Sequence, residues 1–469
     1  MTAAGVTGGL AVGTAELVER ALALASLPCV IRAGERTEAN LRWANSALTT
    51  NGEMHSRTLT VTATAPVEGG TAVGTVTRQI QSLDGVGAVV TAAEAVASAG
   101  PPAEDAIPLV TGTADPGWDA EPATTSIDVL DGVAAGLGAA FSRADEVGQL
   151  LFGFAEHIVT TTYLGSSTGV RRRGVQPSGR LEINAKTADL GSSAWVGAAT
   201  RDFTDVDVAT MHAELTTRLG WAAHRVDLPP GRYETLLPPG AVADLMIYMH
   251  WTASARDAEE GRNAFSAGDG RTRIGERLSE LPIRLCSDPH YPGLECLPFV
   301  DSTMTMQGSS VAFDGGAEIV PVDWILDGVL RELVRNRGQA ARTGLAPTIP
   351  ADNLIMDGGG AATLAEMIAA TDRGLLLTTL WYIREVDPER LLLTGLTRDG
   401  VYLIESGQIV GAVNNFRFNE SPIELLGRLT EVGASEKTLC REWNDYVNRT
   451  AMPPIRVPDF NMSTVSQAS

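Results

Sequence analysis

Residues 239–265 constrain the fold of this chain more than any other stretch. Pro238-Pro239-Gly240 ends a loop, and the apolar run over residues 241–249 predicts a buried helix. Helices of this kind can carry two metal-binding histidines one turn apart, with a glutamate beside one of them as general base. Here His250 is the only histidine of the stretch, and no acidic residue adjoins it. The stretch therefore predicts a core helix with an incomplete metal motif.

The composition is that of a globular chain. Of its 469 residues, 44% are hydrophobic and 20% are charged, which is too apolar for general disorder. A chain of this length predicts roughly two to four domains. Its net charge of −21 opposes binding to nucleic acid and to anionic lipid. We therefore expect neither nucleic acid nor a membrane as a partner.

Cysteine usage and the first residues favour a cytoplasmic protein. The four cysteines, at positions 29, 286, 296 and 440, form no CxxC pair. The first residues lack the basic segment of a secretory signal, and no apolar run approaches the length of a membrane helix.

Periodicity predicts a multi-domain α+β fold with antiparallel sheets and a mainly antiparallel β C-terminal domain. We place an N-terminal α/β domain over residues 1–120, a domain of antiparallel strands over 121–227, and the C-terminal domain over 228–462. Helices are expected at residues 14–25, 85–99, 126–144 and 205–220. Asn51-Gly52 predicts a hairpin turn, and residues 391–413 predict a three-stranded meander with turns at Asp399-Gly400 and Ser406-Gly407.

Two short motifs have alternative interpretations. Residues 165–169 match the GxSxG nucleophile elbow of hydrolases, which would make Ser167 a nucleophile. The residues that follow are strand-like rather than helical, so a hairpin turn is favoured. Cys286, His290 and Cys296 form a loose cluster that offers three metal ligands at irregular spacing, and ordinary loop packing is favoured there.

His212, beside Glu214 on an expected surface helix, is predicted to be solvated.

Several collinear stretches together resemble the TldD/PmbA (TldE) family, once described as modulators of DNA gyrase. They are residues 40–46 and 49–52, 160–169 (TTTYLGSSTG), 201–203, 229–233, 273–276, 380–388 (LWYIREVDP) and 394–418. Each stretch is modest alone, but their shared order covers nearly the whole chain.

The resemblance implies a zinc peptidase made of two kinds of subunit. TldD-type subunits carry an HExxxH helix at the place of residues 239–265 and a late cysteine ligand, whereas TldE-type subunits lack these ligands. With His250 as first histidine, the glutamate position is Trp251 and the second histidine position is Ala255. A register over residues 246–251 contains no motif either, and Cys440 lacks glycine neighbours. No metal ligand or catalytic residue of the family is therefore carried over to this chain.

The sequence is accordingly interpreted as a TldE-type, non-catalytic subunit that pairs with a TldD-type protease subunit and handles unfolded peptides. The resemblance implies zinc in the partner and no cofactor in this chain. Two alternatives stay open: a free-standing hydrolase using Ser167 or the cluster of Cys286, His290 and Cys296, and a non-proteolytic modulator related to gyrase or to a toxin–antitoxin system.

Overall fold

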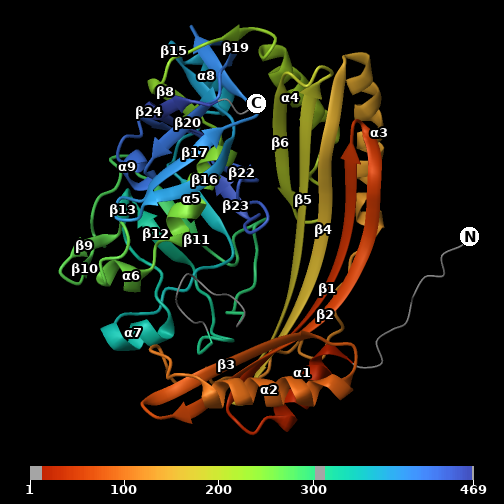
Figure 1. Ribbon diagram of the computed structural model, residues 1–469, viewed down its shortest axis with the longest axis vertical. Coiled ribbons are helices and arrows are strands. Elements are labelled where there is room, and N and C mark those ends of the chain that lie inside the picture. Colours follow the sequence, from red (N-terminus) through yellow and green to blue (C-terminus); the bar gives the residue numbers. More distant parts are fainter. Residues whose placement is uncertain (1–12, 302–311, 467–469) are drawn as a thin grey trace, which may run out of the picture.

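One part of the molecule is a long antiparallel sheet. The computed structural model describes residues 13–301 and 312–466, and the sheet stands beside the C-terminal part (Figure 1). Its strand order is β3-β2-β1-β4-β5-β6. The strands are β1 (Cys29–Ala44), β2 (Ala47–Val67), β3 (Gly70–Gln79), β4 (Gln149–Ser166), β5 (Arg171–Thr187) and β6 (Ser193–Thr200). Because β1 pairs with β4, strands on both sides of the predicted boundary at residue 120 belong to one sheet.

Four helices cover this sheet in two pairs. They are α1 (Thr14–Leu24), α2 (Val86–Ala99), α3 (Asp131–Glu146) and α4 (Val208–Trp221), close to the predicted ranges. The first two pack against the end of the sheet near β3, and the other two against the far end (Figure 1). Each pair buries its own apolar cluster, so the long sheet carries two separate cores.

The turn between β1 and β2 differs from the prediction. Asn51-Gly52 lies inside β2, where Asn51 pairs with Leu41. The chain instead reverses at Asn45 and Ser46, both of which have positive φ, 52° and 57°. A two-residue turn of this kind needs two left-handed residues, and asparagine adopts that conformation readily. The predicted turn was wrong because β1 already ends at Ala44, and the residues up to Asn51-Gly52 pair back onto it as the first part of β2.

The C-terminal part contains a ten-stranded sheet of order β16-β17-β20-β24-β8-β15-β18-β19-β7, with β21 paired to β24. The strands are β7 (Arg225–Val226), β8 (Gly231–Leu237), β15 (Arg373–Leu377), β16 (Leu380–Asp387), β17 (Leu392–Thr397), β18 (Val401–Glu405), β19 (Gln408–Val413), β20 (Phe416–Glu420), β21 (Glu431–Val432) and β24 (Ile455–Val465). Both predicted turns of the meander exist, but β17 pairs with β16 and β20 rather than with β18. Only β18 and β19 form the expected hairpin.

A second six-stranded sheet and short helices complete this part. The sheet has the order β13-β12-β11-β14-β23-β22. Its strands are β11 (Arg284–Ser287), β12 (Val322–Leu326), β13 (Val329–Leu330), β14 (Leu354–Asp357), β22 (Glu436–Thr438) and β23 (Thr450–Met452). The remaining elements are α5 (Pro239–Trp251), α6 (Ala255–Glu259), β9 (Ser266–Gly268), β10 (Arg271–Thr272), α7 (Arg337–Thr343), α8 (Leu364–Ala369) and α9 (Pro422–Leu426). The predicted fold class, multi-domain α+β with mainly antiparallel sheets, is confirmed.

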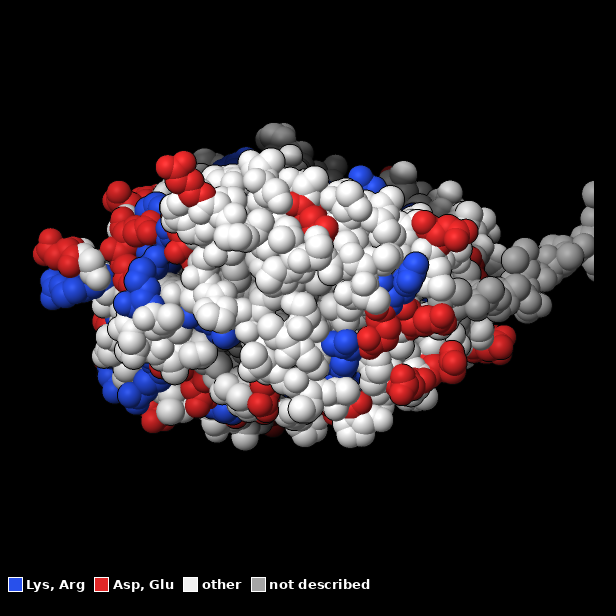
Figure 2. Space-filling model, turned by 90° about the horizontal axis from the view of Figure 1, so that it is seen from below, with Lys and Arg blue, Asp and Glu red and all other residues white. Residues whose placement is uncertain are grey.

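The face beside α2 is poor in charge. Figure 2 views the molecule from this side, and uncharged residues cover the middle of the face. The only charged residue of α2 is Glu94, which accepts hydrogen bonds from the backbone amides of Ser26 (2.6 Å) and Leu27 (2.9 Å). Within the described residues, no helix combines the length and apolar character needed to cross a membrane.

The position of the β1–β2 turn can be tested by substitution. Asn45→Ala forces alanine into a left-handed conformation and should lower stability by about 1 kcal/mol, whereas Asn45→Gly should be tolerated. Asn51→Ala is the matched control, because Asn51 is an exposed strand residue. We expect thermal unfolding to show a lowered midpoint for Asn45→Ala only; a larger loss with Asn51→Ala would contradict the register.

Candidate functional site

The helix α5 forms because its sequence is apolar on all sides. Pro238 is extended at the N-cap, and Pro239 occupies the first turn, where its missing amide hydrogen costs nothing. Nine of its 13 residues are buried. A helix that is apolar all round belongs inside a core, and α5 lies in the largest apolar cluster of the protein. The helix expected over residues 241–249 is confirmed.

One acid inside α5 fixes a distant loop to the helix. Asp244 is fully buried, and its carboxylate accepts hydrogen bonds from the backbone amides of Arg441 (3.2 Å) and Glu442 (2.9 Å). The Trp443 indole donates to the Asp244 carbonyl oxygen at 3.0 Å. Burial raises the pKa of Asp244 well above its usual value. We call residues 439–449 the bridging loop, because the same loop also reaches the long sheet.

On its other side, the bridging loop binds β5. Arg441 pairs with Glu182 at 2.6 Å, and Asp445 pairs with Arg180 at 2.5 Å. The Arg441 guanidinium also lies 4.9 Å from the Trp195 ring and 4.8 Å from the Trp381 ring. The planar guanidinium of an arginine can stack on aromatic rings and bind a carboxylate at the same time, and these contacts hold the Arg441 side chain in place. The bridging loop therefore couples α5 to the long sheet through directional contacts.

His250 is a packing residue in this structure. Its ring centroid lies 4.7 Å from that of Trp324, and its Nε2 atom is buried without a hydrogen-bond partner among the described residues. Burial lowers the pKa of His250 to about 4, so the imidazole is neutral at physiological pH.

The other two motif positions offer no metal ligand. Trp251 ends α5 and packs edge-on against Trp443, with ring centroids 5.2 Å apart. Ala255 begins a separate short helix, α6, and is fully buried. A zinc ion needs about three protein ligands from nitrogen, oxygen or sulfur. The donor set at His250, Trp251 and Ala255 is a single imidazole, so these positions do not fit a zinc ion.

The cysteines lie apart from one another in apolar surroundings. Cys286 and Cys296 belong to different apolar clusters, and His290 is exposed. Burial raises the pKa of Cys286 to about 11 and that of Cys296 to about 12, which leaves both as thiols. Cys440 is fully buried in the bridging loop, and its Sγ lies 3.3 Å from the Val447 carbonyl oxygen. The residues that the structure describes include no group of three or more His, Cys, Asp or Glu side chains able to hold a metal.

Ser167 sits in the turn between β4 and β5, as the favoured interpretation predicted. Its hydroxyl oxygen accepts a hydrogen bond from the Cys29 amide at 3.0 Å, and its own amide donates to the Cys29 carbonyl oxygen. Strand β5 follows, rather than the helix that a nucleophile elbow requires. The hydroxyl is thus a structural acceptor.

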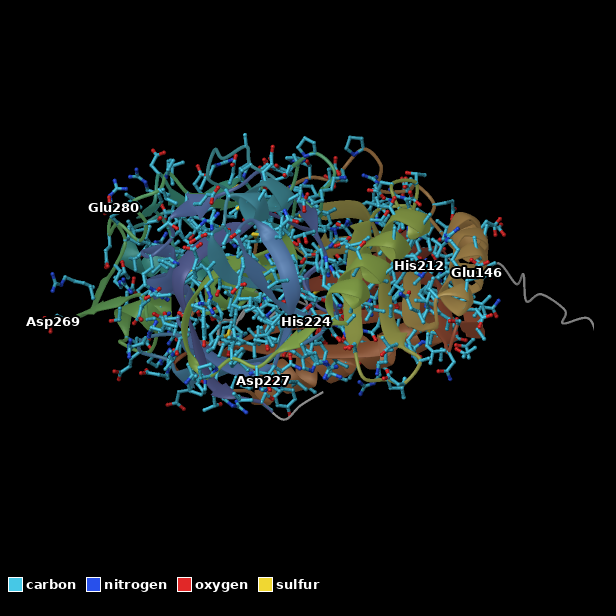
Figure 3. The ribbon with its side chains drawn as sticks, turned by 90° about the horizontal axis from the view of Figure 1, so that it is seen from above. Glu146, His212, His224, Asp227, Asp269 and Glu280 are labelled. Carbon is cyan, nitrogen blue, oxygen red and sulfur yellow. The ribbon has the colours of Figure 1, made fainter. Side chains whose placement is uncertain are left out.

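His212 was predicted to be solvated, and that prediction was wrong. It is buried on α4, and Figure 3 shows it on the side of the helix that faces α3. Burial, with a smaller contribution from the Arg143 charge on α3, lowers the pKa of His212. On a helix that packs against a sheet, the buried residues are those whose side chains point towards the sheet. The presence of Glu214 two residues away does not show which way the His212 side chain points.

The matches to known proteins agree with this architecture. Residues 230–464 match the family model described as the PmbA/TldA metallopeptidase C-terminal domain. No curated protein matches the sequence. TldE from Thermococcus kodakarensis has a similar structure, with TM-score 0.75 and 16% identity over 95% of this chain and 98% of that chain.

Two further solved structures are similar. A candidate modulator of a DNA gyrase from Thermotoga maritima gives TM-score 0.75 and 17% identity, over 95% of this chain and 99% of that one. A candidate modulator of DNA gyrase from Bacteroides thetaiotaomicron gives TM-score 0.72 and 13% identity, over 96% and 97%.

Asp244 should be essential for the attachment of the bridging loop. Asp244→Ala leaves two backbone amides without their acceptor and should cost about 2–5 kcal/mol of stability. Asp244→Asn keeps one carbonyl acceptor and should cost less than half as much. Glu146→Ala, at an exposed position of α3, is the control. Hydrogen exchange of the Arg441 and Glu442 amides reports the attachment, and unchanged protection in Asp244→Ala would contradict it.

His250 is half-buried, with its Nε2 atom out of contact with solvent, and should make stability depend on pH. The unfolded chain takes up a proton near its ordinary pKa of about 6.5, whereas the folded pKa is about 4. Stability is therefore fully present above the unfolded pKa and is lost as the pH falls towards the folded one. Between about pH 7 and about pH 5 the loss should be about 2 kcal/mol. Urea unfolding of His250→Phe should lack this contribution; an equal loss in the variant would contradict it.

Proposed function

The chain belongs to the PmbA/TldD family, and we propose that it is a non-catalytic, TldE-type subunit that pairs with a TldD-type zinc peptidase subunit. The observation that carries this proposal is the donor set on α5. At the motif positions, α5 offers the neutral imidazole of His250 and the indole of Trp251, and the third position is the methyl group of Ala255 on α6. The likeness of fold to TldE from Thermococcus kodakarensis supports the same assignment.

In this proposal α5 serves as scaffold. A zinc site requires ligands that are held in place and a general base beside the bound water. Here the same helix is packed on all sides, and Asp244 ties it to the bridging loop. The partner subunit would supply the zinc, its ligands and the general base. This chain would provide a rigid interface and part of the wall of the peptide chamber.

The proposed substrate is an unfolded peptide, bound in the cytoplasm, with neither nucleic acid nor membrane as partner. An extended peptide can add to an exposed sheet edge and be read through its backbone. The long sheet ends in the edge strands β3 and β6, and the ten-stranded sheet ends in the edge strands β16 and β7. The net charge of −21 supports the exclusion of nucleic acid.

The proposal is tested by metal content and activity. We expect the isolated chain to hold substoichiometric zinc and to show no peptidase activity, and we expect activity and stoichiometric zinc after mixing with a TldD-type partner. His250→Phe should leave the activity of the mixture unchanged, because this imidazole lies outside the chemistry. Stoichiometric zinc in the isolated chain would overturn the proposal.

The two alternatives give different results in the same assay. A free-standing hydrolase predicts activity of the isolated chain that Ser167→Ala or Cys286→Ala abolishes. A non-proteolytic modulator predicts recovery of a gyrase or toxin–antitoxin component, without a TldD-type protein, when the chain is used as bait. Either outcome would replace the subunit assignment.

A further inference from the structure

A polar cavity of about 590 Å³ lies between the long sheet and the ten-stranded sheet. We call it the Asp399 cavity. Its walls come from the β5–β6 turn, the end of α4 and the β17–β18 and β19–β20 connections. The exposed residues Arg225 and Asp227 stand at its rim. Figure 3 shows Asp227 near His224 on the segment that leaves α4, beside the C-terminal part. The volume is in the range of cavities that bind small molecules.

Three polar atoms of its lining have no hydrogen-bond partner among the described residues. They are Oδ2 of Asp399, the Tyr402 hydroxyl and Nδ2 of Asn414. Asp399 is 4% exposed and Tyr402 is fully buried. A buried polar atom without a partner costs free energy, and native proteins contain few of them. Three such atoms belong to residues that line this one cavity, so the polar groups of its wall are not fully satisfied by the described residues.

Each of these groups is held in place by its neighbours. The other oxygen of Asp399 accepts a hydrogen bond from the Ser193 hydroxyl at 2.6 Å. The Asn414 side-chain oxygen accepts from the Leu228 amide at 2.7 Å, which leaves its amide nitrogen as the available donor. Gly400 has φ +133°, and a Cβ there would lie 2.6 Å from the Tyr402 hydroxyl. Glycine thus keeps open the space that the phenol occupies.

Two cations line the same cavity close to Asp399. Lys186 and Arg398, with Asp399, also line a second cavity of about 250 Å³, so these three residues stand where the two cavities meet. The Lys186 ammonium lies 5.6 Å from the Phe152 ring, and the Arg398 guanidinium 6.0 Å from the Trp381 ring. Neither cation forms a salt bridge within the described residues. Both therefore have charge available for an anionic group.

We propose that the Asp399 cavity binds the carboxyl-terminal end of an extended peptide. Lys186 and Arg398 bind the terminal carboxylate. Asp399 accepts a hydrogen bond from a peptide N–H, and the Asn414 amide donates to a peptide carbonyl. The Tyr402 hydroxyl donates a hydrogen bond to the peptide carboxylate or accepts one from the peptide N–H. The choice of a peptide over other carboxylates rests on the proposed function. The choice of an anion with a nearby N–H rests on the two cations and the carboxylate that line the cavity.

Other ligand types match the lining less well. An inorganic anion such as phosphate carries mostly acceptors at neutral pH, so Asp399 would face it without a donor and would repel it. A simple amine would meet Asp399 favourably but would be repelled by Lys186 and Arg398. A carboxylate separated from an amide N–H by a single Cα presents an acceptor and a donor together, which matches a cavity lined by two cations and a carboxylate.

The lysine content gives a direct readout. Lys186 and Lys437 are the only lysines of the chain. Lys437 lies outside the Asp399 cavity, 3.8 Å from Asp205. Reductive methylation with 13C-formaldehyde keeps the charge and gives each lysine its own NMR signal. The probes are N-acetyl-tetra-alanine with a free carboxylate and the same peptide with a terminal amide. We expect the acid to shift the Lys186 signal only, and the amide to bind about tenfold more weakly.

Substitutions assign the roles of single groups. Tyr402→Phe removes a hydroxyl that has no protein partner, so it should leave the thermal midpoint unchanged while weakening acid binding about fivefold. Asp399→Asn exchanges the free acceptor for a donor and should weaken binding about tenfold. Lys437→Met is the charge-matched control for Lys186→Met, and only the Lys186 variant should lose binding.

Several results would overturn the proposal. They are the absence of any Lys186 shift with either peptide, equal binding of acid and amide, and equal binding of phosphate. Free alanine separates a site for amino acids from a site for peptide ends, and tighter binding of alanine than of the peptide acid would also overturn it. Because binding is measured on the isolated chain, this test can fail while zinc and activity after mixing still support the proposed function, and the reverse can also occur.

Discussion

The carboxylate of Asp244 is the contact on which the arrangement of the C-terminal part depends. A fully buried acid is costly unless its oxygens are hydrogen-bonded, and here two backbone amides of the bridging loop supply those bonds. Glu442 extends the connection, because its own carboxylate accepts from the Tyr382 and Ile383 amides of β16 at 2.9 Å and 3.0 Å. A helix, a loop and a strand are thereby held in one arrangement by directional bonds rather than by apolar packing alone.

This constraint also explains how the two halves of the molecule keep their relative position. The bridging loop meets β5 through Arg180 and Arg441, each of which is paired with an acid and mostly buried. Interfaces between domains of one chain are commonly polar and allow motion unless directional contacts restrict it. Here the same short loop is anchored on both sides, so a displacement of α5 would strain the contacts at the long sheet. The position of α5 relative to the long sheet is in this sense fixed by directional contacts.

The sequence predicted those features that depend on local pattern. The apolar run of α5 indicated a buried helix, and the turn at Ser167 followed from the strand-like residues after it. Asp244 could not be recognised, because the amides it binds lie 197 and 198 residues further along the chain. The direction of His212 and the partners of β17 were likewise decided by packing, which a single sequence does not encode in its periodicity. Asp399-Gly400 was correctly identified as a turn, but nothing local indicated that its carboxylate faces a cavity.

The same contrast separates the two functional regions. At His250, Trp251 and Ala255 the residue types themselves are informative, because an indole and a methyl group offer no metal-binding atom in any surroundings. At the Asp399 cavity the residue types are ordinary, and the information lies in which of their atoms remain unpaired: one oxygen of Asp399 is bonded to Ser193 and the other is not. The two proposals therefore rest on different kinds of observation: the first on what the residue types at His250, Trp251 and Ala255 can bind, and the second on which polar atoms beside the Asp399 cavity lack a partner.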